Sequence, residues 1–313
     1  MFDTTNKRSY SAGHFQLDID GEETTAYLKT VDGGYVKATT IDEPIGPYNL
    51  RVKHTSVTDI DPISFEFGLA GSHHVLDWIR QSWKKQWSRR NGQITHADFN
   101  MFRTFEHEFT QALITETTFP ALDAGSKEAA YLKVKLQPEG VAHRKPTHAS
   151  RIRPKVGPKQ KMWVPSAFRL KIDGIDGLEW VSKIESFTIK QGVKWLKPGD
   201  EKYRAHGQVE PTKIEFPNLV CSMSLQYADA VLKWYEDAVV IGQSDDISQR
   251  NGSIEFLDPT RTKVLFRLKL SEVGIFHLAM EQSTANAEAI KKIKFQLFVG
   301  EMDLDGSLGM DRG

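Results

Sequence analysis

The sequence predicts a mainly β (α+β) fold arranged as two tandem domains, each with one helix. The first observation is an internal repeat: Val75, Leu76 and Trp78 recur as Val231, Leu232 and Trp234, and Asn91-Gly92 recurs as Asn251-Gly252. Each copy is too long to be a solenoid unit. The second is apolar alternation with period two in many short segments, which is typical of half-buried strands. The third is the length of 313 residues, which suits two domains of roughly 150 residues each.

The first domain is expected to span residues 14–140, after a flexible tail at residues 1–13. Phe15, Leu17 and Ile19 alternate with polar residues as a strand, and further strands are expected at 48–58, 63–69, 104–118 and 129–136. Apolar residues recur every four positions from Val75, which predicts an amphipathic helix at 73–87. Asn91-Gly92 is expected to form a turn.

The second domain is expected to span residues 166–305, followed by a flexible tail at 306–313. The elements come in the same order, with strands at 168–172, 212–216, 220–225, 254–257, 264–270 and 293–299, a helix at 227–241 and a turn at Asn251-Gly252. Each domain is therefore expected to be a small β-sandwich or half-open barrel, with the helix covering one end or face.

Residues 141–165 form a basic, proline-rich linker between the two domains. It contains no acidic residue, and its basic residues are Arg144, Lys145, Arg151, Arg153, Lys155, Lys159 and Lys161. Four prolines keep the segment extended. Two interpretations remain open: a solvated linker, or a basic arm that lies on an acidic neighbouring subunit or on nucleic acid.

Two features suggest contacts between subunits. The second domain has a long insertion at about residues 193–208, and the corresponding stretch of the first, residues 39–47, is shorter. The insertion is either an exposed loop or an arm that reaches a neighbouring protomer, and its candidate contact residues are Lys197, Asp200, Lys202 and Arg204. Trp87, at the end of the first helix, is a further candidate because aromatic residues are favoured at protein interfaces.

Composition excludes several classes of function. The formal net charge is zero, so no global field recruits nucleic acid or a membrane surface. Cys221 is the only cysteine and is expected to pack as a small apolar residue. No signal peptide and no membrane-spanning segment are predicted. The protein is expected to stay in the cytoplasm where it is made, or to leave by a route that needs no signal, such as lysis.

No catalytic or cofactor-binding pattern stands out. The chain lacks a phosphate-binding glycine loop, a nucleophile elbow and a His-Glu-x-x-His zinc motif. Glu106-His107-Glu108 and His73-His74 are the best metal candidates, but on a strand His107 points away from both glutamates. The sequence therefore predicts no enzyme activity, no catalytic residue, no metal and no cofactor.

The order of elements in each half resembles the tail tube proteins of contractile phages and related injection systems. The resemblance includes the helix with Trp78 and a closing segment in which Pro120 is followed by Asp123, Gly125 and Ser126, and then by the strand of Leu132, Val134 and Leu136. In the second half Met280-Glu281-Gln282 stands where Pro120 is expected. The resemblance covers about 120 residues in each half.

The resemblance implies a structural protein of a virion tail or injection particle, synthesised in the host cytoplasm. Six such domains form a ring, their sheets join into one inner barrel, and rings stack into a tube that conducts DNA or an effector. With two domains per chain, a ring contains either three chains, as in a pseudo-sixfold hub or tube initiator, or six. Partners would be further copies of the chain and sheath, baseplate or hub proteins, but no membrane. The rival interpretation is a non-enzymatic binding module that holds an acidic partner through the basic linker.

Overall fold

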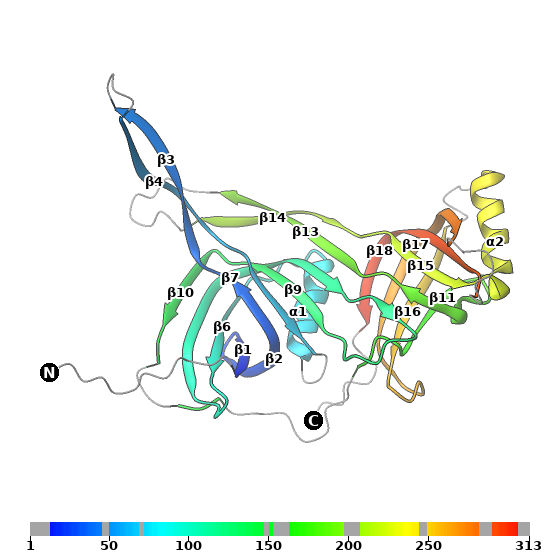
Figure 1. Ribbon diagram of the computed structural model, residues 1–313, viewed down its shortest axis with the longest axis horizontal. Coiled ribbons are helices and arrows are strands. Elements are labelled where there is room, and N and C mark those ends of the chain that lie inside the picture. Colours follow the sequence, from blue (N-terminus) through cyan, green and yellow to red (C-terminus); the bar gives the residue numbers. More distant parts are fainter. Residues whose placement is uncertain are drawn as a thin grey trace.

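The computed structural model describes residues 13–45, 50–68, 72–146, 150–152, 163–196, 207–243, 249–281 and 290–305. The predicted mainly β fold with one helix in each half is confirmed. A closed barrel built from the first repeat lies beside an open half-barrel built from the second (Figure 1). Among the described residues, no helix is long and apolar enough to span a membrane.

The first repeat forms a barrel in the strand order β7-β6-β1-β2-β5-β9, which closes because β7 also pairs with β9. Its elements are β1 (His14–Ile19), β2 (Glu22–Gly33), β3 (Val36–Ile45), β4 (Leu50–Ile60), β5 (Ile63–Phe67), α1 (His73–Trp83), β6 (Arg90–Ala97), β7 (Arg103–Phe119), β8 (Leu122–Asp123), β9 (Leu132–Gln137) and β10 (Gly140–Arg144).

The second repeat has the strand order β11-β16-β17-β18-β15-β12. This is the order of the first repeat when that barrel is read from β1, as β1-β6-β7-β9-β5-β2. Within the described residues, no pairing of β11 with β12 closes the second barrel. Its elements are β11 (Phe168–Ile172), η1 (Leu178–Trp180), β12 (Val181–Ile184), β13 (Phe187–Leu196), β14 (Gln208–Glu215), β15 (Leu219–Ser224), η2 (Leu225–Tyr227), α2 (Asp229–Tyr235), its π-helical continuation η3 (Glu236–Val240), β16 (Arg250–Leu257), β17 (Val264–Met280) and β18 (Lys292–Asp305).

The registers of the two long strands establish the duplication residue by residue. Thr117 of β7 pairs with Val134, and Leu278 of β17 pairs with Phe295, so Thr117 corresponds to Leu278. Both strands contain a non-glycine residue with positive φ at the matching position, Gln111 and Glu272. This unusual backbone conformation at the same place in both copies supports a common ancestor for the two repeats.

The helix of the first repeat shows why these residues fold as they do. Val75, Trp78 and Ile79 are buried against the barrel, as their helical spacing predicts. Burying the aliphatic side chains of Val75 and Ile79 contributes about 1.5–3 kcal/mol each. The Trp78 indole Nε1 also donates a hydrogen bond of 2.8 Å to the Ser88 carbonyl oxygen, so the ring is buried with its polar group satisfied.

Two predictions of turns and loops are wrong. Asn91-Gly92 and Asn251-Gly252 do not form turns but lie inside β6 and β16. Glycine is needed there because a neighbouring strand passes too close to leave room for a side chain. A Cβ on Gly92 would lie 2.6 Å from the Asp18 carbonyl oxygen, and one on Gly252 would lie 2.5 Å from that of Lys171. Most of the predicted loop at 39–47 lies in β3. Residues 193–196 and 208 of the predicted loop at 193–208 lie in β13 and β14, and residues 197–206 lie outside the described residues.

Candidate functional site

The two repeats are joined edge to edge by a continuous sheet. The β13–β14 hairpin leaves the second repeat and lies along the first barrel (Figure 1). There β13 pairs antiparallel with the end of β7, with Phe187 opposite Phe119 and Lys190 opposite Glu116. Backbone pairing of this kind satisfies an edge that would otherwise be exposed. The sheet of one repeat therefore continues into the sheet of the other.

Aromatic side chains fill the core beneath this joint. Phe119 and Phe187 stack with centroids 4.9 Å apart and an interplanar angle of 13°. Phe119 also contacts Trp83 of the first repeat and Phe256 of the second. On the opposite face of the sheet, the Thr118 and Thr188 hydroxyl oxygens lie 2.9 Å apart. The two repeats thus share one apolar core across the joint.

A reciprocal exchange strengthens the joint. The short strand β8 of the first repeat adds to the edge of β12, with Leu122 opposite Ile184 and Asp123 opposite Lys183. Leu122 and Ile184 are both fully buried. Each repeat therefore gives a strand to the other, so the two repeats cannot separate without breaking both sheets.

Charged contacts surround the shared core. At the end of α1, Lys84 Nζ lies 3.3 Å and Arg80 Nε 3.9 Å from the Asp303 carboxylate of β18. At the hairpin, the Arg89 guanidinium donates to the Val209 carbonyl oxygen at 2.7 Å, and its Nε lies 3.3 Å from the Glu139 carboxylate. The contacts of Lys84, Arg80 and the Arg89–Val209 hydrogen bond therefore link the two repeats at the edge of the shared core.

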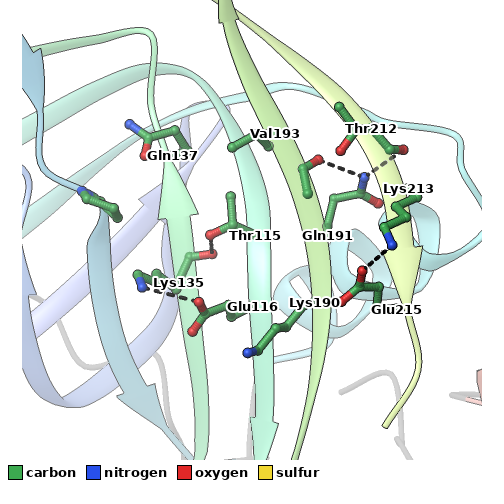
Figure 2. A pocket seen from close by; sticks show the side chains of 12 residues that line it. Thr115, Glu116, Lys135, Gln137, Lys190, Gln191, Val193, Thr212, Lys213 and Glu215 are labelled. Atoms are coloured by element: carbon green, nitrogen blue, oxygen red, sulfur yellow. Dashed lines mark hydrogen bonds and ion pairs between the residues drawn. The ribbon is translucent and has the colours of Figure 1, made fainter.

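A cavity of about 360 Å³, lined mostly by polar and charged residues, lies where the hairpin crosses the first barrel (Figure 2). Ion pairs occupy its walls: Lys135 with Glu116 at 3.2 Å, and Lys213 with Glu215 at 2.6 Å. The hydrogen bond from Lys213 lowers the pKa of the Glu215 carboxyl below its ordinary value. Both ion pairs join side chains within the cavity wall, and no serine, cysteine or histidine lines the cavity.

The residues predicted for intersubunit contact are only partly described. Lys197, Asp200, Lys202 and Arg204 lie outside the described residues, as do Arg153, Lys155, Lys159 and Lys161 of the linker. Trp87 is 38% exposed just beyond α1, so it stays a candidate. None of the sequence patterns pointed to the joint itself, because alternation predicts a strand but not which distant strand it pairs with.

The first part of the predicted linker lies on the barrel. Arg144 belongs to β10, where its guanidinium binds the carboxylates of Glu106 at 2.7 Å and Glu108 at 2.5 Å. These hydrogen bonds raise the pKa of Arg144. Arg151 forms a bridge with Phe102, and Lys145 is exposed. Arg144 is therefore engaged within the chain and is not free to hold an acidic partner.

A cluster of rings lies below the base of the β3–β4 hairpin. His107 Nε2 donates to the Gly34 carbonyl oxygen at 2.8 Å and lies 3.1 Å from His143 Nε2, while Tyr35 stacks on His143. Burial, and then the charge of His143, lower the pKa of His107 to about 4. Among the described residues, no group of His, Cys, Asp or Glu side chains is arranged to hold a metal ion.

Comparison with known families identifies the first repeat. Residues 11–142 match the family model described as T4-like virus tail tube protein gp19. The first repeat therefore belongs to the tail tube protein family. The protein is a structural component of a phage tail or contractile injection particle, and the family is non-enzymatic. The second repeat is connected to the family by its matching strand order and registers.

Several solved structures share features of this fold at low identity. One is a chain of the sheath-tube complex of an extracellular contractile injection system, PVC, in the extended state: 18% identity, a TM-score of 0.39, 44% of this chain and 93% of that chain. Another is the tube terminating cap of the anti-feeding prophage. It has 15% identity and a TM-score of 0.39, and the match covers 46% of this chain and 97% of that chain. A third is Hcp1 from Flavobacterium johnsoniae. It has 13% identity and a TM-score of 0.27, and the match covers 45% of this chain and 95% of that chain. No curated protein sequence matches significantly.

Proposed function

We propose that three copies of this tail tube protein form one ring, so that six tube domains alternate around the axis as first and second repeats. The observation that carries the proposal is the joint between the repeats, where β13 extends the sheet of the first barrel. Two domains joined edge to edge have the relation expected of neighbours in a ring. Closed cyclic symmetry then requires the same kind of joint between one chain and the next.

One run of strands supports this arrangement. Three stretches of paired strands follow one another in the chain. β3 pairs with β4; β5, β9, β7, β13 and β14 pair in that order; and β15, β18 and β17 pair in that order. Strand β4 leads into β5, and β14 leads into β15, with two or three residues between them. A ring of three chains would join three such runs into one inner barrel.

The free face of this run carries several ion pairs. Along it, lysines pair with glutamates: Lys135–Glu116, Lys213–Glu215 and Lys294–Glu185. A channel lined with unpaired basic residues would hold the phosphates of DNA. We propose that this face lines the lumen, where paired charges let DNA or an effector pass without being retained. Sheath, baseplate or hub proteins are the partners expected outside the ring.

Electron microscopy of the purified protein tests the proposal directly. Rings with six lobes and a mass of three 35.5 kDa chains are the expected result. Rings of six chains would place one repeat outside the inner barrel and refute the three-chain arrangement. Particles that stay monomeric at all concentrations would refute ring formation. Stacked rings would indicate a tube, and isolated rings a hub or tube initiator.

A further inference from the structure

We infer that the ring closes when the β3–β4 hairpin of one copy pairs with the end of β17 in a second copy, while the α2–η3 tip of that second copy packs on β10 of the first. The inference rests on the proposed ring and names the two surfaces that would make its chain-to-chain joint. Each of these surfaces corresponds to a surface of the other repeat that is already paired or packed within the chain.

The end of β17 is an edge without a partner strand among the described residues. The corresponding end of β7, residues 115–119, is covered by β13 and is largely buried. In β17 the matching residues 276–280 pair with β18 on one side only, and Phe276 and Met280 are exposed. An exposed strand edge carrying apolar side chains is a template for another strand.

The β3–β4 hairpin is an arm that has no strand of another sheet to pair with among the described residues. It corresponds to β13–β14, since Lys37 pairs with Asp59 as Lys190 pairs with Glu215. Among the described strands β3 pairs only with β4, and all of β3 is exposed. Figure 1 shows the hairpin projecting away from both barrels. Several of its exposed side chains are apolar: Val36, Ile41, Ile45, Leu50, Val52 and Val57.

The register of the new pairing follows from the joint inside the chain. Thr188 lies opposite Thr118 there. Tyr35 corresponds to Thr188, and Ala279 corresponds to Thr118, by the strand registers of the two repeats. Tyr35 of one copy would therefore lie opposite Ala279 of the next, with the strands antiparallel.

The helix tip provides a second contact with different chemistry. Inside the chain, Lys84 of α1 reaches Asp303 of β18. The counterparts of these residues are Val240 and Ala142 of β10. The tip is an exposed apolar patch, in which Val240 and Ile241 are 68% and 60% exposed. Figure 1 places α2 and β10 at opposite ends of the molecule, so the tip of one copy meets β10 of another only in an assembly.

Disulfide trapping with matched pairs tests the pairing. Tyr35→Cys with Ala279→Cys places thiols across the proposed joint, and Thr118→Cys with Thr188→Cys places them at the equivalent position inside the chain. Residues directly opposite on antiparallel strands are close enough for a disulfide. The native Cys221 is buried, and burial raises the pKa of its thiol, so it should not interfere.

On a non-reducing denaturing gel, the Tyr35→Cys/Ala279→Cys protein should give covalent species that end at three chains, and the control pair should give single chains. Rings visible by microscopy without cross-links would overturn the inference and leave the proposed ring standing. A ladder that ends at six chains would support the pairing but refute the three-chain ring. Single chains with neither rings nor cross-links would refute both.

A charge at the helix tip tests the second contact. Val240→Asp should raise the protein concentration needed for ring formation at least about tenfold. The new carboxylate would be buried opposite Ala142, and Arg144 of the same strand is already paired with Glu106 and Glu108. Lys84→Asp is the matched control, since it puts the same charge at the equivalent position where the covalent chain already holds the repeats together. Rings that form equally well with Val240→Asp would show that the tip makes no contact.

Discussion

The histidine cluster predicts that the first repeat loses stability in mild acid. His107 is fully buried, and its pKa of about 4 lies below the ordinary value of 6.5. The unfolded chain therefore binds a proton in a pH range where the folded chain does not. The contribution of neutral His107 is complete above about pH 6.5 and is lost as the pH falls towards 4. A difference of about 2.5 pKa units at 1.36 kcal/mol each makes this loss roughly 3 kcal/mol.

The perturbation that isolates this effect is His107→Leu. The second repeat already has a leucine at this position, since Leu268 of β17 corresponds to His107 and is buried. Urea unfolding at pH 7.5 and pH 4.5 measures the free energy of unfolding of both proteins. The loss between these values should be about 2–3 kcal/mol smaller in His107→Leu. His96, whose pKa is also lowered by burial, adds to the remaining dependence in both proteins.

A neighbouring substitution separates protonation from packing. Phe105→Leu removes a ring that stacks near His143 but leaves His107 in place. It should lower stability by a similar amount at each pH and keep the wild-type slope. If His107→Leu kept the full wild-type loss between pH 7.5 and 4.5, the reasoning from burial to pKa to stability would be refuted.

Three further predictions concern the joint and a buried acid. Phe119→Ala should cost about 3–5 kcal/mol in urea unfolding, whereas Met280→Ala, at the exposed counterpart, should change monomer stability by less than about 0.5 kcal/mol. Asp303→Asn should cost under about 1 kcal/mol, and the cost should vanish at high salt, because its partners are partly exposed. Burial alone would raise the pKa of Glu255, but hydrogen bonds from Lys171 and Arg267 lower it. Glu255→Gln should therefore cost about 1–3 kcal/mol at pH 7 and less below pH 4.

The repeat, the helices and the central strands could be predicted because their residues alternate between a core and solvent. Phe65 of β5 and Leu132 of β9 are examples, since both are fully buried beside exposed or half-buried neighbours. The β3–β4 hairpin could be predicted only in part. The sequence predicts a strand at 48–58, which corresponds to β4, but no strand at β3. All of β3 is exposed, so no core imposes a period on it.

The long strand β17 shows a second reason for failure. Its first residues alternate clearly, and the prediction of a strand at 264–270 is correct as far as it goes. The period then changes at Glu272, which has a positive φ, and the register shifts again between Ile275 and His277. Each irregularity moves the following side chains to the other face, so a single alternation does not cover the strand.

The two joints of the proposed ring differ in chemistry, and this difference has a consequence for assembly. Inside the chain Phe187 lies opposite Phe119. Between chains, the same positions hold Gly34 and Met280. If the hairpin of one first repeat paired with β7 of another, Gly34 would lie opposite Phe119 and leave its ring without the stack that Phe187 provides. If β13 paired with another β17, Phe187 would lie opposite the flexible Met280, and the Thr188–Thr118 contact would be lost. Unlike joints therefore favour alternation of first and second repeats over rings of like repeats, since specificity is a difference between the right and wrong pairings. A duplicated chain in which both joints had kept the same residues would not favour alternation of first and second repeats.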